Sequence, residues 1–399
     1  MKIGNIIYDL DDGGAAIALT RINKLLNNKK KISTIISYKK EIVQKKYNFF
    51  IQFKSLSKLF INKFFKKIFS KIFNLNYMNT INFNFFDSPL LNIINKSNFN
   101  IINLHWIGND TLSIKDIGSI NKKVIITLHD MWPYTSIEHY IDEKTFLVNY
   151  VNQSKKINYF LKSIFNKKLR YFKNISHVLC SSKWQKKMVD KSPIFKHAKK
   201  IIIPLPIDFN LWKPTNKILS KTKLGFDKNL FTIFLPLSNR FAAKRKGLDL
   251  LISSLNMIDD IKICLITTNT DKILFKNKNI LHKNIHNPKE PSELMKIYSA
   301  TDLFAMPSRF ESFGQTLLEA QACNCPAIIF KNTGCEDMIL HKKNGYIAEY
   351  MNIKDLEAGI RWCVKRFRYK QKYNIRKHAQ KKYSERVIYE KYQKLFKEM

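Results

Sequence analysis

Two carboxylates, Glu311 and Glu319, stand eight residues apart in the stretch Pro-Ser-Arg-Phe-Glu-Ser-Phe-Gly-Gln-Thr-Leu-Leu-Glu-Ala that begins at Pro307. The apolar residues 303–306 before it predict a short buried strand, and residues 316–323 predict a helix. A helix that follows a sheet strand directs unpaired backbone N–H groups toward the place where an anion can bind. The stretch therefore indicates a phosphate site, with carboxylates nearby to accept hydrogen bonds from sugar hydroxyls.

The second of these carboxylates has core-like neighbours. Glu319 lies among Leu317, Leu318 and Ala320, and burying a carboxylate without a partner is costly. A ribose diol would supply two hydrogen-bond donors to it. For both glutamates, a helix-capping or ion-pairing role is the alternative interpretation.

A basic loop at residues 238–247 contains Arg240 and Lys246 and lies between a predicted strand at 230–237 and a predicted helix at 248–256. A guanidinium can hold a diphosphate through two parallel hydrogen bonds, and an ammonium adds a point charge. Both cations could stabilise the negative charge that grows on a departing phosphate. The alternative is a solvated basic loop.

The first half of the chain opens with a predicted strand at 3–10, an Asp-Asp-Gly-Gly loop and a predicted helix at 15–27. This order is typical of the start of a doubly wound α/β domain. Gly13 and Gly14 would let the backbone come close to a phosphate. A purely structural turn explains the two glycines equally well.

Two histidines lie at the ends of predicted strands. His105 is near the end of a strand at 100–106, and His129 follows a strand at 123–128. Open α/β sheets bind their ligands at the carboxyl ends of the strands. Two histidines at two such ends favour a functional role over a structural one.

Strands and helices alternate in both halves of the chain. This pattern predicts an α/β fold with two Rossmann-like, doubly wound parallel-sheet domains that face each other across a cleft. Two prolines and a change of register after Ile203 mark the linker. We expect domains at 1–205 and 206–375, and a C-terminal helix at 376–399 that packs back toward the first domain. The other predicted strands are at 32–37, 176–181, 261–267 and 327–330, and the other predicted helices are at 141–172, from 183, at 293–299 and from 353.

The net charge of +39, from 70 Lys and Arg against 31 Asp and Glu, favours an anionic partner such as nucleic acid or membrane lipid. The abundance of Lys, Asn, Ile and Phe also fits a genome rich in A and T. Within residues 47–73 a helix would carry Ile and Phe on one face and Lys on the other. Such a helix suits an anionic membrane surface, and packing on the protein's own sheet is the alternative.

Six cysteines without paired spacing, in or beside apolar runs, predict reduced core thiols of a cytoplasmic protein. The start of the chain predicts a strand and lacks the features of a signal peptide. There is no run of about 18 uncharged apolar residues, the length that a membrane span needs. We therefore expect a cytoplasmic protein, in peripheral contact with the inner face of the plasma membrane if residues 47–73 bind lipid.

These motifs resemble glycosyltransferase family 4, the retaining GT-B enzymes. The resemblance rests on the two glutamates within Pro-Ser-x-x-Glu-Ser-Phe-Gly-x-x-x-Leu-Glu-Ala and on Arg240-x5-Lys246-Gly247 upstream. In the first half, Gly-Gly-Ala-Ala from Gly13, Asn-Leu-His-Trp from Asn103 and Thr-Leu-His-Asp-Met-Trp-Pro from Thr127 resemble the branch that builds bacterial exopolysaccharide, such as colanic-acid-type transferases. The resemblance runs from about residue 3 to residue 395.

The family implies a donor site and no metal, cofactor or nucleic acid. Retention without an evident nucleophile fits a front-face mechanism, in which the leaving phosphate helps to deprotonate the acceptor hydroxyl. The resemblance implies that the diphosphate is bound by Gly13, Gly14, Arg240 and Lys246. The donor sugar would be contacted by His129 and Glu311, and the ribose by Glu319. The N–H groups of Phe313 and Gly314 would lie close to sugar or phosphate.

The implied activity is the transfer of a hexose-type sugar from a UDP- or GDP-linked donor to a saccharide acceptor, lipid-linked, in cell-surface polysaccharide biosynthesis. The first domain would bind the acceptor and the second the nucleotide sugar. Residues 135–140 depart from the Gly-Gly-Cys-His turn of close relatives, which leaves the acceptor open. The alternatives are an inactive GT-B scaffold subunit and a basic nucleic-acid-binding protein, for which no recognition helix, zinc finger or single-strand-binding motif is present.

Overall fold

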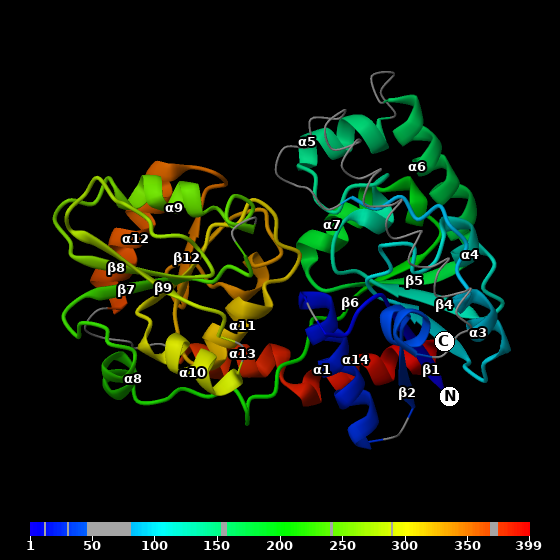
Figure 1. The fold of residues 1–399 in the computed structure, drawn as a ribbon, viewed down its shortest axis with the longest axis horizontal. Helices are drawn as coiled ribbons and strands as arrows, with labels where there is room; N and C mark the ends of the chain where they lie inside the picture. The colour runs from blue at the N-terminus through cyan, green and yellow to red at the C-terminus, as the bar shows by residue number, and fades with distance from the viewer. Residues whose placement is uncertain are drawn as a thin grey trace. The chain divides into compact units, whose positions relative to one another are not determined.

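The computed structural model describes residues 1–11, 13–29, 32–45, 81–152, 158–239, 242–288, 290–367 and 374–399. The chain divides into two compact units, Met1–Leu205 and Pro206–Met399. Each unit contains a six-stranded parallel sheet with flanking helices (Figure 1), which confirms the predicted fold class. The predicted helix at 47–73 and the predicted phosphate ligand Arg240 lie outside the described residues.

The N-terminal unit has the strand order β2-β1-β3-β4-β5-β6, with all neighbours parallel. Its central strands read as continuous apolar runs because both faces of a parallel sheet are covered by helices. Figure 1 shows α4 and α6 beside one another, and their residues are in contact. The strands are β1 (Ile3–Ile7), β2 (Ser33–Ser37), β3 (Ile101–Leu104), β4 (Lys123–Thr127), β5 (Ile175–Cys180) and β6 (Lys199–Ile202). The helices are α1 (Gly14–Lys29), α3 (Leu90–Lys96), α4 (Ile114–Gly118), α5 (Glu143–Phe146), α6 (Tyr159–Tyr171) and α7 (Lys183–Lys191).

The helix predicted at 141–172 is divided in the structure. Asp142 caps α5, a π-helical turn follows at Leu147–Val151, and α6 starts anew after Asn158, whose side chain accepts a hydrogen bond from the backbone N–H of Phe160. Asp and Asn favour such capping positions because their side chains satisfy free N–H groups of the first turn. In a lysine-rich stretch without a clear apolar pattern, the separate beginnings of α5 and α6 were not recognised.

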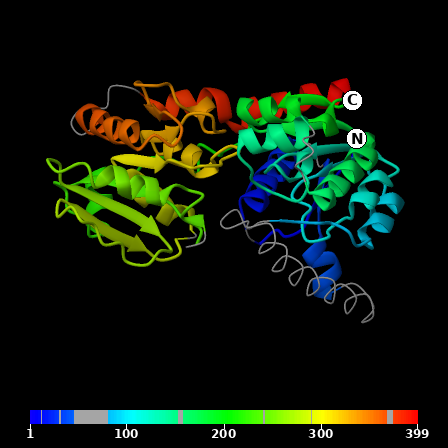
Figure 2. The ribbon, with the colours of Figure 1, turned by 90° about the horizontal axis from the view of Figure 1, so that it is seen from above.

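The C-terminal unit has the strand order β12-β11-β10-β7-β8-β9, again parallel throughout. In Figure 1, α9 and α12 cover one face of this sheet, and α8, α10, α11 and α13 cover the other. Figure 2 shows β7, β8 and β9 side by side from another direction. The strands are β7 (Phe231–Leu235), β8 (Ile263–Thr268), β9 (Ile280–Ile285), β10 (Leu303–Met306), β11 (Ala327–Phe330) and β12 (Gly345–Ala348). The helices are α8 (Lys217–Lys223), α9 (Leu248–Leu255), α10 (Pro291–Ala300), α11 (Gln315–Ala322), α12 (Ile353–Phe367), α13 (Ile375–Tyr383) and α14 (Glu385–Glu398).

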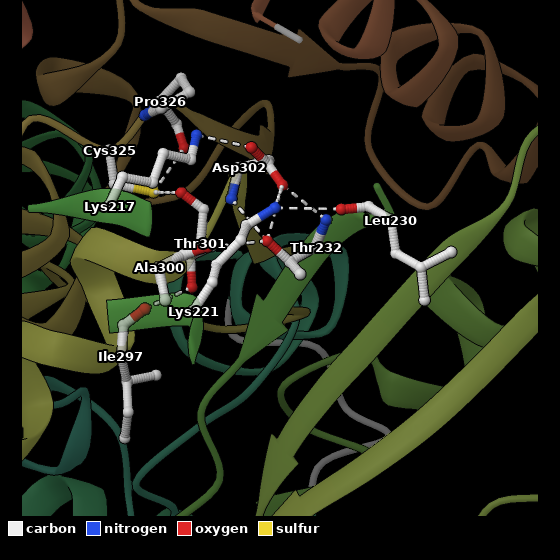
Figure 3. Close-up of polar contacts among 10 residues, drawn as sticks. All are labelled: Lys217, Lys221, Leu230, Thr232, Ile297, Ala300, Thr301, Asp302, Cys325 and Pro326. Carbon is white, nitrogen blue, oxygen red and sulfur yellow. Dashed lines mark hydrogen bonds and ion pairs between the residues drawn. The ribbon is translucent and has the colours of Figure 1, made fainter. Parts of the chain in front are cut away.

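A buried carboxylate at the start of β10 ties α8 to the sheet (Figure 3). Asp302 accepts from the ammonium groups of Lys217 at 2.5 Å and Lys221 at 2.8 Å, which lie one turn apart on α8. It also accepts from the backbone N–H and the hydroxyl of Thr232 on β7, at 2.8 and 2.7 Å. Burial opposes its ionisation, but the two lysines hold the pKa of Asp302 below its usual value. This cluster fixes the amino end of β10, and the chain then runs through the strand to the candidate site.

All six cysteines are buried and unpaired, which confirms the prediction of core thiols. Burial raises the pKa of Cys180 and of Cys325 to about 12, so these thiols stay protonated at neutral pH. Within the described ranges, no helix combines the length and the apolar character that a membrane crossing requires.

Candidate functional site

The strand-loop-helix junction of the C-terminal unit has the predicted form. All four residues of β10 are buried, and α11 begins at Gln315, one residue earlier than predicted. Gly314 precedes the helix with a φ of +93°, a left-handed conformation that residues with a side chain rarely adopt. A glycine here is therefore a requirement of the backbone that turns from the strand into the helix.

Two other glycines let neighbouring loops touch this junction backbone to backbone. A Cβ added to Gly247 would lie 1.9 Å from the carbonyl oxygen of Pro307, and one added to Gly334 would lie 1.9 Å from that of Ser312. The N–H of Gly334 also donates to the carbonyl of Glu311 at 2.7 Å. The loop after β10 is thus held between the basic loop after β7 and the loop after β11.

Lys246 and Glu311, predicted separately as phosphate and sugar ligands, are in direct contact. The Nζ of Lys246 lies 2.5 Å from Oε2 of Glu311, and a guanidinium nitrogen of Arg245 lies 3.9 Å from the same oxygen. Arg245 also donates to the carbonyl of Phe310 at 3.2 Å. Burial raises the pKa of the Glu311 carboxyl, but the two cations outweigh it and hold that pKa below its usual value. Two cations, Lys246 and Arg245, and the ionised carboxylate of Glu311 thus lie together beside the start of α11.

Glu319 is 5% exposed, and its carboxylate accepts a hydrogen bond at 3.0 Å from the hydroxyl of Tyr298 on α10. A partner for this buried glutamate is therefore present inside the protein. Phe313 is 4% exposed and packs edge-on against Tyr383, with ring centroids 5.9 Å apart. The backbone N–H of Phe313 donates a hydrogen bond to the Glu311 carboxylate and helps to lower the pKa of that group, while its side chain contributes to the core.

In the N-terminal unit, His105 and His129 meet at the carboxyl edge of the sheet. Nδ1 of His105 lies 3.0 Å from Nε2 of His129, so the rings meet edge to edge, with centroids 5.2 Å apart and planes inclined by 30°. Burial lowers the pKa of His105 well below its usual value, and the neighbouring His129 adds to this. Burial also lowers the pKa of His129 to about 4, against the opposing charge of Asp130. Both rings are therefore neutral near neutral pH.

The two histidines line a small recess of about 10 Å³, which has room for about one water molecule. A second pair, missed in the sequence, forms part of its wall: Nδ1 of His139 lies 2.5 Å from a carboxylate oxygen of Asp130. Burial opposes the ionisation of Asp130, but His139 holds its pKa below the usual value. The lining residues are His105, Trp106, Ile107, Gly108, His129, Asp130, Trp132, Pro133 and His139.

Gly13 precedes α1, which begins one residue earlier than predicted. Gly13 has a φ of +91°, and a Cβ added there would meet no atom within 4 Å, so the backbone conformation alone calls for glycine. Gly14 is the first residue of α1. The predicted site residues thus fall into two groups, each within its own unit: Gly13, Gly14 and His129 in the N-terminal unit, and Lys246, Glu311, Phe313, Gly314 and Glu319 in the C-terminal unit.

The described residues contain no group of three or more His, Cys, Asp and Glu side chains placed to hold a metal ion. The prediction missed Arg245, although it lies beside Lys246 in a loop already singled out. It also missed Asp130 and His139, because nine residues separate them in sequence and no periodic pattern connects them.

Residues 221–382 match the model of the family described as "Glycosyl transferases group 1". Among curated proteins, the capsular polysaccharide biosynthesis glycosyltransferase CapM of Staphylococcus aureus is 26% identical over 143 residues, which are 35% of this chain and 34% of that protein. A Campylobacter jejuni relative, N,N'-diacetylbacillosaminyl-diphospho-undecaprenol alpha-1,3-N-acetylgalactosaminyltransferase, is 30% identical over 108 residues, 26% of this chain and 28% of that protein. The chain matches well under half of the length of these relatives.

The fold is shared over the whole chain with solved structures. HepE of Anabaena, in complex with UDP and glucose, has a TM-score of 0.61 and 15% identity, and the similarity covers 100% of both chains. The two doubly wound parallel-sheet units are accordingly those of a GT-B fold.

Proposed function

We propose that this protein is a retaining glycosyltransferase of family 4, which transfers a hexose-type sugar from a nucleoside diphosphate to a saccharide acceptor. The observation that carries the proposal is the contact between Lys246 and Glu311 beside the start of α11. It lies inside the stretch that matches the group 1 family. The pair supplies both halves of donor recognition, a cation for phosphate and a carboxylate for sugar hydroxyls.

The proposed roles follow from charge and position. The ammonium of Lys246 would bind the diphosphate and stabilise the charge that develops as it leaves, together with Arg240. The carboxylate of Glu311, kept ionised by its cations, would accept hydrogen bonds from the donor sugar. Glu319, already hydrogen-bonded by Tyr298, would take the ribose diol.

The N-terminal unit has roles in the same proposal. The ring of His129 would contact the donor sugar, and the turn at Gly13 and Gly14 would allow a close approach of the backbone to the diphosphate. A lipid-linked acceptor in polysaccharide biosynthesis is supported by the names of the Campylobacter and Staphylococcus relatives. HepE, solved with UDP and glucose, supports a nucleotide-sugar donor.

The test is donor turnover by the full chain. The protein would be incubated with UDP- and GDP-linked hexoses, and the release of nucleoside diphosphate would be measured with two near-isosteric variants, Lys246→Met and Glu311→Gln. We expect each variant to lose on the order of 10²–10³ in kcat, the scale measured when one group that stabilises developing charge is removed. Thermal unfolding of each variant would show that the fold is retained.

Lys331→Met is the matched control, because it removes a lysine from an exposed pair in the same unit, 3.0 Å from Glu349. This variant should turn over donor like the wild type. Normal turnover by both Lys246→Met and Glu311→Gln would refute the site assignment. A wild-type protein that binds no nucleotide sugar would instead support the inactive-scaffold alternative.

A further inference from the structure

A series of buried, hydrogen-bonded polar side chains crosses the N-terminal sheet and ends at His129. Asn5 on β1 is 0% exposed, Asn103 on β3 is 3% exposed, and Thr127 on β4 is 4% exposed. His105, directly after β3, is 2% exposed. Polar groups inside a core cost free energy unless they are hydrogen-bonded, so the direction of each bond here is constrained by its neighbours.

Asn5 fixes which groups in this series donate hydrogen bonds and which accept them. Its Nδ2 donates to the backbone carbonyl oxygen of Thr34 at 3.3 Å and to the hydroxyl of Ser33 at 2.8 Å. A carbonyl oxygen can only accept, so the nitrogen of the Asn5 amide must lie on that side. Oδ1 of Asn5 therefore points the other way and acts as an acceptor.

The orientation of the Asn103 amide determines which nitrogen of His105 accepts a hydrogen bond. Its Nδ2 donates to Oδ1 of Asn5 at 3.2 Å, while its Oδ1 accepts from the hydroxyl of Thr127 at 3.0 Å. The same Nδ2 lies 3.0 Å from Nε2 of His105. The competing contact is longer: Nε2 of His105 lies 3.2 Å from Oδ1 of Asn5, an amide oxygen that can accept a second hydrogen bond. A proton on Nε2 would set two N–H groups against each other at the shorter distance, so Nε2 accepts and the proton of His105 lies on Nδ1.

The hydrogen bond between the two rings then sets the tautomer of His129. Nδ1 of His105 lies 3.0 Å from Nε2 of His129, so a protonated Nδ1 makes Nε2 of His129 the acceptor. We propose that His105 is a positioning residue that holds His129 in the Nδ1–H tautomer. His129 then donates, and does not accept, any hydrogen bond that it makes to a ligand through Nδ1.

The tautomer matters because of the ligand chemistry that it selects. A neutral N–H donor suits an oxygen that gains negative charge, such as that of a sugar hydroxyl or a departing phosphate. Burial lowers the pKa of both rings, so neither carries a second ring proton near neutral pH. The identity of the ligand rests on the proposed function, but the tautomer does not.

The experiment reads the tautomer directly. Long-range ¹H–¹⁵N correlation spectra of the full chain, labelled with ¹⁵N in histidine, distinguish ring nitrogens that carry a proton from those that do not. The His129 signals would be assigned by their disappearance in His129→Gln. We expect a protonated Nδ1 and an unprotonated Nε2 for His129 in the wild type. A proton on Nε2 of His129 in the wild type would overturn the proposal, whether or not any variant folds and whether or not the protein turns over a donor.

Two substitutions at His105 separate positioning from packing. His105→Phe keeps the ring but removes both nitrogens, and we expect His129 to lose its single tautomer. In a turnover assay kcat should fall by at least about tenfold, the scale typical of groups that orient a functional histidine, with little change in KM for the donor. His105→Gln can accept from Asn103 and donate to His129, and it should restore the tautomer and most of kcat.

His282→Gln is the control. This histidine accepts a hydrogen bond from a backbone N–H in the C-terminal unit, at Ile273, and its loss should leave the His129 signals unchanged. An unaltered His129 tautomer in His105→Phe would contradict the proposal. Normal tautomers in a protein that turns over no donor would leave the positioning intact and count against the proposed function alone.

Discussion

At the scale of single residues, the neutral His129 ring should make the protein sensitive to acid. A histidine in an unfolded chain titrates near about 6.5, whereas burial lowers the pKa of His129 to about 4. Between these values the unfolded state binds the proton and the folded state does not, so stability is full above about pH 6.5 and falls as the pH drops toward 4. At about 1.4 kcal/mol per pH unit, the loss from this ring is about 3 kcal/mol.

The His129→Asn variant should therefore lose less stability between about pH 6.5 and 4 than the wild type. The measurement is the thermal unfolding midpoint across this range. His197→Asn, which removes an exposed histidine of the same unit, should keep the wild-type pH dependence. Parallel curves for wild type and His129→Asn would show that the buried ring does not titrate in this way.

Several site residues could be identified from their types and spacing, because each lies in a short local motif. Lys246, Glu311 and the glycine at 314 are of this kind. The contact between Lys246 and Glu311 was not predicted as such, since ion pairing remained only an alternative for Glu311. It forms between two loops that lie 65 residues apart, and only the packing of β7 beside β10 brings them together. The hydrogen-bonded side chains behind His129 could have been suspected from the sequence, because Asn103 and His105 are polar residues two positions apart within an apolar strand.

At the scale of elements, the three strands that the sequence analysis missed are all at sheet edges. None of β6, β9 and β12 was predicted as a strand. An edge strand has a neighbour on one side only and needs fewer apolar residues, so its pattern is weak. β9 shows this, since only Ile280 of its six residues is fully buried. The central strand β7, with five buried residues, was predicted within two residues of its true ends.

The attachment of α8 to the sheet gives a prediction at this scale. Asp302→Ala would leave the ammonium of Lys221, whose side chain is 7% exposed, without its carboxylate. Breaking a buried pair by removing one partner typically costs about 3–5 kcal/mol, and we expect a loss of this size in the free energy of unfolding in urea.

Glu349→Ala is the comparison for this variant, since it breaks an exposed ion pair with Lys331 in the same unit. Exposed pairs contribute about 0–1 kcal/mol, so its effect should be small. Because the pKa of Asp302 is lowered in the folded state, the difference between wild type and Asp302→Ala should be largest above about pH 4 and shrink below it. Equal losses in the two variants would mean that the buried cluster does not stabilise the fold.

At the scale of the whole molecule, the charge of +39 leads to a prediction about membranes. Binding to vesicles that contain anionic lipid should be clear at low ionic strength and weaken strongly at about 0.5 M salt, because added ions screen the attraction. Vesicles of neutral lipid should bind little. Co-sedimentation measures both. Salt-independent binding, or equal binding to neutral vesicles, would favour an apolar contact over an electrostatic one.

The same excess of lysine has a consequence where the sheets end. β6 and β9 are the last strands of their sheets, and they carry Lys199, Lys200 and Lys283. An outermost strand has backbone groups that a second molecule could pair with, and like charges along it oppose that approach. In a chain with 29 phenylalanines, these lysines should help the protein to stay dispersed at high concentration, so replacing them with threonine should promote aggregation before it changes the fold.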